Sequence, residues 1–118
     1  MRNLLDKLID QCHSKYHLQL LFPSDPFILQ LECENQRYTL SFSNKECFVA
    51  EELSNLEPQF VIKGSEEMIT TVLAGHELLS RMAERDQLSV KGGYRPLLFV
   101  ESVLWLTRPM LKEPVEIY

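Results

Sequence analysis

Apolar and polar residues alternate strictly just after Pro26, and this alternation is the clearest pattern in the chain. Strict alternation over several residues is typical of a strand with one buried face. Two short polar pairs, Asn35-Gln36 and Asn44-Lys45, interrupt the apolar stretches and are interpreted as two-residue turns. The pattern therefore predicts a meander of three antiparallel strands over residues 27–49.

The two turns also predict how the strands pair. The first turn places Leu31 opposite Leu40 and Leu29 opposite Phe42. The second turn extends the same apolar face by placing Leu40 opposite Val49. A slip of one residue would set these apolar side chains opposite Glu, Thr and Ser, so the pattern favours one buried face.

Apolar residues recur at helical spacing before and after the meander. We expect an amphipathic helix over residues 4–12, a second helix that follows Ser65 as its N-cap and stops near Gly75, and further helical turns over residues 78–82. Short strands are expected over residues 59–63 and 88–91. The chain is thus predicted to be a single α+β domain, residues 1–118, with a five-stranded sheet.

Residues 94–107 are predicted to form a helix that is apolar on nearly all sides. Its apolar residues are Leu97, Leu98, Phe99, Val100, Val103, Leu104, Trp105 and Leu106. Such a helix must be covered by more than one surface, and in a chain of 118 residues the sheet covers only one of them. Three coverings are open: the N-terminal helix, a second subunit in a homodimer, or a ligand.

Composition limits the classes of partner and the cellular location that we expect. The 12 Lys and Arg against 17 Asp and Glu give a net charge of −5, which repels nucleic acid and anionic lipid surfaces. The three cysteines include no C-x-x-C pair and predict reduced thiols in the cytoplasm. No apolar run approaches the roughly 20 residues of a membrane span, and charged residues interrupt the N-terminal stretch that a secretory signal would need.

Candidate chemistry is sparse. Cys12-His13 is an adjacent pair, but neighbours on a helix point about 100° apart, so a buried structural Cys12 and a solvated His13 are favoured over a catalytic pair. The spacing of His17 and His76 suggests no metal site, and no cofactor is expected. We therefore expect a protein that is not an enzyme.

Residues 91–95 contain the only glycine cluster and join a predicted strand to a predicted helix. They lack the spacing of a phosphate-binding loop, which favours a simple tight turn. In the alternative interpretation, Lys91 and Arg95 meet the carboxylate or phosphate end of an amphipathic ligand.

The order of these elements and three local motifs resemble those of a known family. The motifs are Phe60-Val61-Ile62-Lys63-Gly64-Ser65, Leu73-Ala74-Gly75 and Leu88-Ser89-Val90-Lys91-Gly92, followed by an apolar last helix. With them the chain resembles the sterol carrier protein 2 family, as a divergent stand-alone member of bacterial type, most specifically over residues 60–93. Gly93 stands where the family often has an acidic residue, and the peroxisomal tail of eukaryotic members is absent.

The resemblance implies a curved, mainly antiparallel sheet covered on one face by helices, with an apolar tunnel between the layers. Carried over by position, the ligand-binding residues are Leu29, Leu31, Leu40, Phe42, Met68, Val72, Phe99, Val103, Leu104 and Trp105. The implied function is to bind a fatty acid, acyl-CoA or other lipid as a carrier or by sequestration, without catalysis. The alternative is an interaction module with a filled core that homodimerises through residues 94–107.

Overall fold

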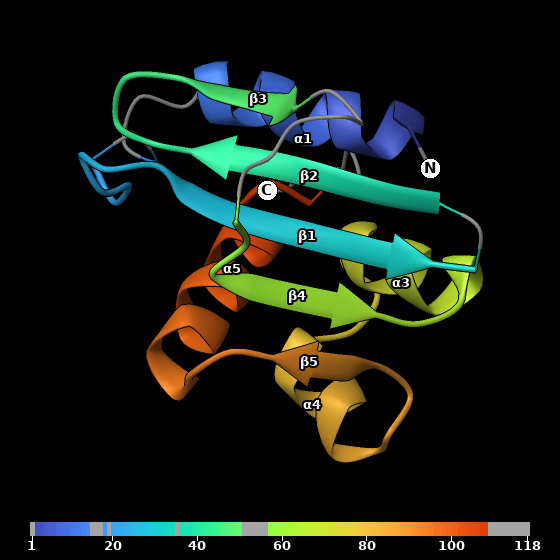
Figure 1. Cartoon of the computed structure of the whole chain (residues 1–118). Coiled ribbons are helices and arrows are strands. Elements are labelled where there is room, and N and C mark those ends of the chain that lie inside the picture. The colour runs from blue at the N-terminus through green and yellow to red at the C-terminus, as the bar shows by residue number, and fades with distance from the viewer. Residues whose placement is uncertain (1, 15–17, 19, 35, 51–56, 109–118) are drawn as a thin grey trace, which may run out of the picture.

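A computed structural model describes residues 2–14, 18, 20–34, 36–50 and 57–108. Helices and a sheet form two layers, with the helices gathered on one face of the sheet (Figure 1). In chain order the elements are α1 (Arg2–Ser14), β1 (Phe27–Cys33), β2 (Gln36–Phe42), β3 (Cys47–Ala50), β4 (Phe60–Lys63), α3 (Glu66–Leu73), α4 (Leu79–Glu84), β5 (Ser89–Lys91) and α5 (Tyr94–Leu106). The α+β prediction is confirmed.

The five strands lie in the order β3-β2-β1-β4-β5. The pairs β1–β2, β2–β3 and β4–β5 are antiparallel, and the central pair β1–β4 is parallel. The sheet is therefore mixed, although mainly antiparallel as predicted. The parallel pair places Leu29 beside Phe60 and Leu31 beside Ile62, which joins the meander to the second half of the chain.

The predicted pairing of β1 with β2 is wrong by two residues. Leu29 pairs with Leu40 and Leu31 with Tyr38, because the hairpin turn begins at Glu34 instead of Asn35. Glu34 has φ +34°, a left-handed conformation that tight hairpin turns require. A shift of two residues keeps every side chain on its predicted face. The pairing of β2 with β3 is confirmed, with Leu40 opposite Val49.

Ser65 begins α3 as predicted. Its hydroxyl accepts a hydrogen bond from the backbone N–H of Met68 at 3.2 Å, and Glu66 and Glu67 occupy the first turn, where negative charge is stabilised by the helix dipole. Ile69, Val72 and Leu73 form the buried side of this helix. The cap and the apolar stripe together fix α3 against the sheet.

The apolar helix α5 is covered mainly by parts of the chain that the sequence did not indicate. It packs against α3 and α4, whereas α1 packs mainly against β3 and α3. Its buried residues are Val100, Val103 and Leu104. Leu98, Trp105 and Leu106 remain 41%, 38% and 38% exposed, so the helix is only partly covered.

Two adjacent glycines before α5 provide a test of the backbone conformation and packing at that point. Gly92 has φ +146°, and a Cβ there would collide with the buried ring of Phe60, so Gly92→Ala is expected to cost about 1–3 kcal/mol of folding free energy. At Gly93, φ is −82° and the nearest atom to a Cβ is Pro96 Cδ at 3.4 Å, so Gly93→Ala is the matched control. Chemical denaturation measures both, and equal losses would contradict this geometry.

Candidate functional site

Nine of the ten predicted ligand-binding residues lie together between the sheet and the helices. Leu29, Leu31, Leu40, Phe42, Val72, Val103 and Leu104 are buried in one core cluster, against which Met68 and Phe99 pack. Trp105 lies apart from them, at the surface near the end of α5. The guanidinium carbon of Arg108 is 4.1 Å from the centre of its ring, a cation–π contact.

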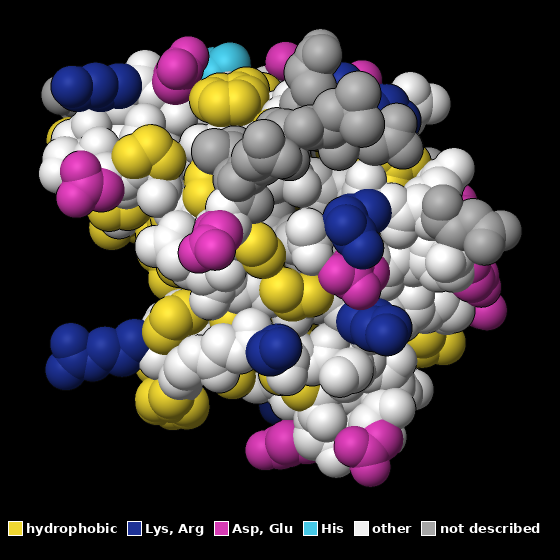
Figure 2. Space-filling model, viewed as in Figure 1, with side chains coloured by type: hydrophobic (Ala, Val, Ile, Leu, Met, Phe, Trp, Pro, Cys, Tyr) yellow, Lys and Arg dark blue, Asp and Glu magenta, His cyan; other side chains and the backbone are white. Residues whose placement is uncertain are grey.

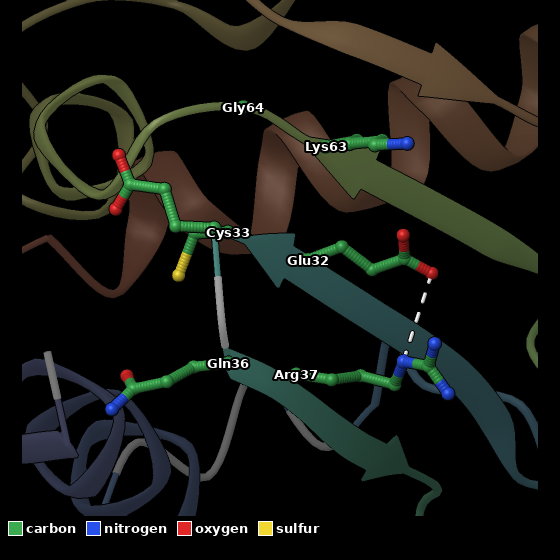
Figure 3. A pocket seen from close by; sticks show the side chains of 7 residues that line it. Glu32, Cys33, Gln36, Arg37, Lys63 and Gly64 are labelled. Carbon is green, nitrogen blue, oxygen red and sulfur yellow. Dashed lines mark ion pairs between the residues drawn. The ribbon is translucent and has the colours of Figure 1, made fainter.

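A polar depression of about 560 Å³ lies at the ends of β1, β2 and β4 (Figure 3). The side chains of Glu32, Arg37 and Lys63 lie on one side of the strands and Gln36 on the other. The Arg37 Nε and Glu32 Oε2 atoms are 3.8 Å apart, so the guanidinium of Arg37 already forms an ion pair with Glu32. Side chains that diverge in this way do not converge on one small molecule.

Two of the three thiols, Cys33 and Cys12, have raised pKa values, whereas a hydrogen bond with Cys12 lowers the pKa of Cys47. Burial, assisted by the negative charges of Glu66 and Glu34, raises the pKa of Cys33. A hydrogen bond with Cys47, together with burial, raises the pKa of Cys12. Cys12 is buried while His13, its neighbour on α1, is exposed, as the helical geometry predicted. Both thiols with raised pKa values stay protonated and poorly reactive at neutral pH.

An apolar depression of about 330 Å³ lies between the loop before β1 and the first two turns of α5. It is lined by Leu21, Pro23, Phe27, Arg95, Pro96 and Phe99. Figure 2 shows hydrophobic side chains on both sides of a hollow at the left edge of the molecule, and a basic side chain that projects beside it. Of the six lining residues only Arg95 carries a charge.

The rings of four phenylalanines connect this depression with the core. Phe99 lies 4.8 Å from Phe27 and 6.0 Å from Phe22, measured between ring centres. Phe22 in turn lies 5.7 Å from Phe42, which belongs to the predicted sheet wall. Phe99 is therefore the predicted residue at which the surface depression and the apolar layer meet.

The sequence missed most of this depression. Leu21 and Pro23 fall in a stretch without regular spacing, and their position depends on tertiary packing. The signal available in the sequence was the apolar run Leu20-Leu21-Phe22 just before Pro23. In the structure Leu20 and Leu21 are 68% and 56% exposed. Lys91 does not share the site with Arg95: it lines a separate depression on the helix-free face, with Val61 and Ser89.

Comparison with known proteins identifies the architecture. No protein-family model and no curated protein matches the chain. Among solved structures, the UbiJ-SCP2 ubiquinone synthesis protein matches with a TM-score of 0.68 at 13% identity, covering 86% of this chain and 89% of that one. The chain has the sterol carrier protein 2 fold.

Two further structures share the sterol carrier protein 2 fold. A crystal structure of sterol carrier protein 2 matches with a TM-score of 0.62 at 14% identity, over 92% of this chain and 96% of that one. The sterol carrier protein domain 2 of Helicoverpa armigera matches with a TM-score of 0.62 at 7% identity, over 91% and 87%. At such low identity the likeness extends to the fold and not to the ligand.

The described part of this sterol carrier protein 2 fold contains neither of two other site types. None of the described helices is both long and apolar enough to cross a membrane. The described residues also contain no group of three His, Cys, Asp or Glu side chains that could hold a metal ion. The apolar layer and the depression beside Phe99 form the candidate site, because the phenylalanine rings connect them.

Proposed function

We propose that this chain binds a lipid-like small molecule, such as a fatty acid or acyl-CoA, and carries or sequesters it in the cytoplasm without catalysis. The apolar chain of the ligand lies between the sheet and the helices. The observation that carries this proposal is the continuity from the apolar depression, through Phe99, to the buried layer that holds Leu40 and Phe42. The solved structures named for sterol carrier proteins support it through their shared fold.

The driving force is removal of hydrocarbon from water. Enclosing a few hundred Å² of ligand surface at about 25 cal/mol per Å² contributes several kcal/mol before the costs of association are subtracted. Seven of the ten predicted lining residues are buried, so the ligand must displace contacts between them. We expect Met68 and Phe99 to move first, because both are only partly buried. Micromolar affinity follows from this balance.

A long-chain fatty acid is expected to raise the melting temperature, because a ligand that binds only the folded state stabilises it. At a ligand concentration about 100 times its Kd, the gain is about 2.7 kcal/mol. Trp105 is the only tryptophan and lies on α5, so its fluorescence should change as the helix adjusts. Differential scanning fluorimetry and tryptophan emission measure the two effects.

The control for this experiment is a short-chain acid with the same carboxylate, which should leave the melting temperature unchanged. If the long-chain acid moves neither the melting temperature nor the emission of Trp105, the lipid-binding proposal fails and only the fold remains. Sedimentation at several protein concentrations tests the alternative of a homodimer through α5, which stays a prediction.

A further inference from the structure

We propose that the ligand enters between residues 20–27 and the first two turns of α5, and that the end of the ligand held there is anionic. The ligand class is a single-chain amphipathic lipid with a carboxylate or phosphate group bound by Arg95. This inference rests on the proposed function and adds the place of entrance, the residues that close it and the side chain that binds the charged end of the ligand.

Apolar side chains lie on both sides of the proposed entrance. Leu21 lines the depression and is 56% exposed, and Leu20 beside it in the chain is 68% exposed. On the other side, Pro96 and Phe99 of α5 line the depression, and both are only partly buried. Exposing large apolar residues on both sides of a hollow has a solvation cost, and a ligand chain that passes between them reduces it (Figure 2).

The phenylalanine rings close the way from the entrance to the core. Phe99 contacts Phe27 and Phe22 through tilted and edge-on ring pairs, and Phe22 stands between Phe99 and Phe42. These rings form no hydrogen bonds, so they can rotate apart without leaving a buried polar group unpaired. Phe22, Phe27 and Phe99 therefore act as a gate that opens for an apolar chain.

Arg95 complements an anionic end. Its side chain is exposed and lies among five apolar residues that line the same depression. A guanidinium forms paired hydrogen bonds with a carboxylate or a phosphate, and this geometry selects such groups over neutral ones. A ligand with one charged end and one apolar chain fits both parts of the depression at once.

The charge of the ligand is tested with cis-parinaric acid, a fluorescent fatty acid, and its neutral methyl ester. In Arg95→Gln the acid should bind about threefold to tenfold more weakly than to the original protein, while binding of the ester is unchanged. Lys91→Gln is the matched control, because Lys91 lies on the helix-free face. Displacement of the acid by hexadecanoic acid or by hexadecyl phosphate then distinguishes a carboxylate site from a phosphate site.

Equal affinities of Arg95→Gln and the original protein for the acid would overturn the anionic site and leave the proposed function standing. Equal weakening of acid and ester would overturn it as well, because the loss would then come from packing. Absence of binding by either probe to the original protein would overturn both proposals.

The gate is tested by stopped-flow mixing with cis-parinaric acid. Phe99→Ala should increase the association and dissociation rates several-fold, with a smaller change in affinity, because it opens the entrance. Phe48→Ala is the control, since Phe48 is 39% exposed and points to the opposite face of the sheet. Rates in Phe99→Ala that equal those of the control would overturn the proposed entrance.

Discussion

Leu40→Asp is expected to unfold the domain. Leu40 is fully buried on β2, where it pairs with Leu29 on one side and Val49 on the other. An aspartate there buries either a charge without a partner or a neutral carboxyl without hydrogen bonds, and removes the packing of the leucine. The combined cost of several kcal/mol is comparable to the roughly 5–15 kcal/mol by which domains are stable. Loss of cooperative melting in circular dichroism is the expected observation.

Thr39→Asp is the matched control for that substitution. Thr39 is the preceding residue on β2, is half-buried on the opposite face and pairs with Gln30 and Ala50. An aspartate there keeps contact with water, so we expect a loss of about 1 kcal/mol or less. Similar melting behaviour of the two variants would show that the assigned faces of β2 are wrong.

Phe42→Ala is expected to cost about 3–5 kcal/mol, because it removes a large buried side chain and leaves a cavity. Phe42 is 1% exposed and its ring centre is 5.7 Å from that of Phe22. The midpoint of urea denaturation should therefore fall markedly. The substitution also removes the inner end of the phenylalanine cluster, so the variant should bind cis-parinaric acid with altered rates if it remains folded.

Phe48→Ala provides the comparison within the same hairpin. Phe48 lies on the outer face of β3 and is 39% exposed, so truncation removes less buried area and creates no enclosed cavity. We expect a loss of about 1 kcal/mol or less. A denaturation midpoint that falls equally in both variants would contradict the placement of Phe42 in the core.

The sequence predicted the elements and their buried faces because both depend on local periodicity. It did not predict the pairing of β1 with β2, since registers that differ by two residues bury the same faces. The choice between them depended on which residue accepts the left-handed conformation. The turn was expected to begin at Asn35, and the structure begins it at Glu34, which has φ +34°.

For the candidate site, too, the sequence predicted the buried residues but not the contacts that depend on tertiary packing. Alternation and helical spacing identified buried residues such as Leu40 and Val103, which need only a face and a layer. The depression around Phe99 depends on where the loop before β1 meets α5, and no periodicity encodes that contact. The neighbouring residues Lys91 and Arg95 separate because the chain turns between them from the sheet to the helical layer.

The short outer strands have a consequence for solubility at high concentration. The edges of the sheet are β3, with four residues, and β5, with three, whereas β1 and β2 have seven residues each and lie inside. Unpaired backbone groups on a long edge strand are a template for aggregation, and short edges limit it. The apolar groups of the proposed entrance are side chains of a loop and a helix, so the protein can expose them without offering another chain a strand to extend.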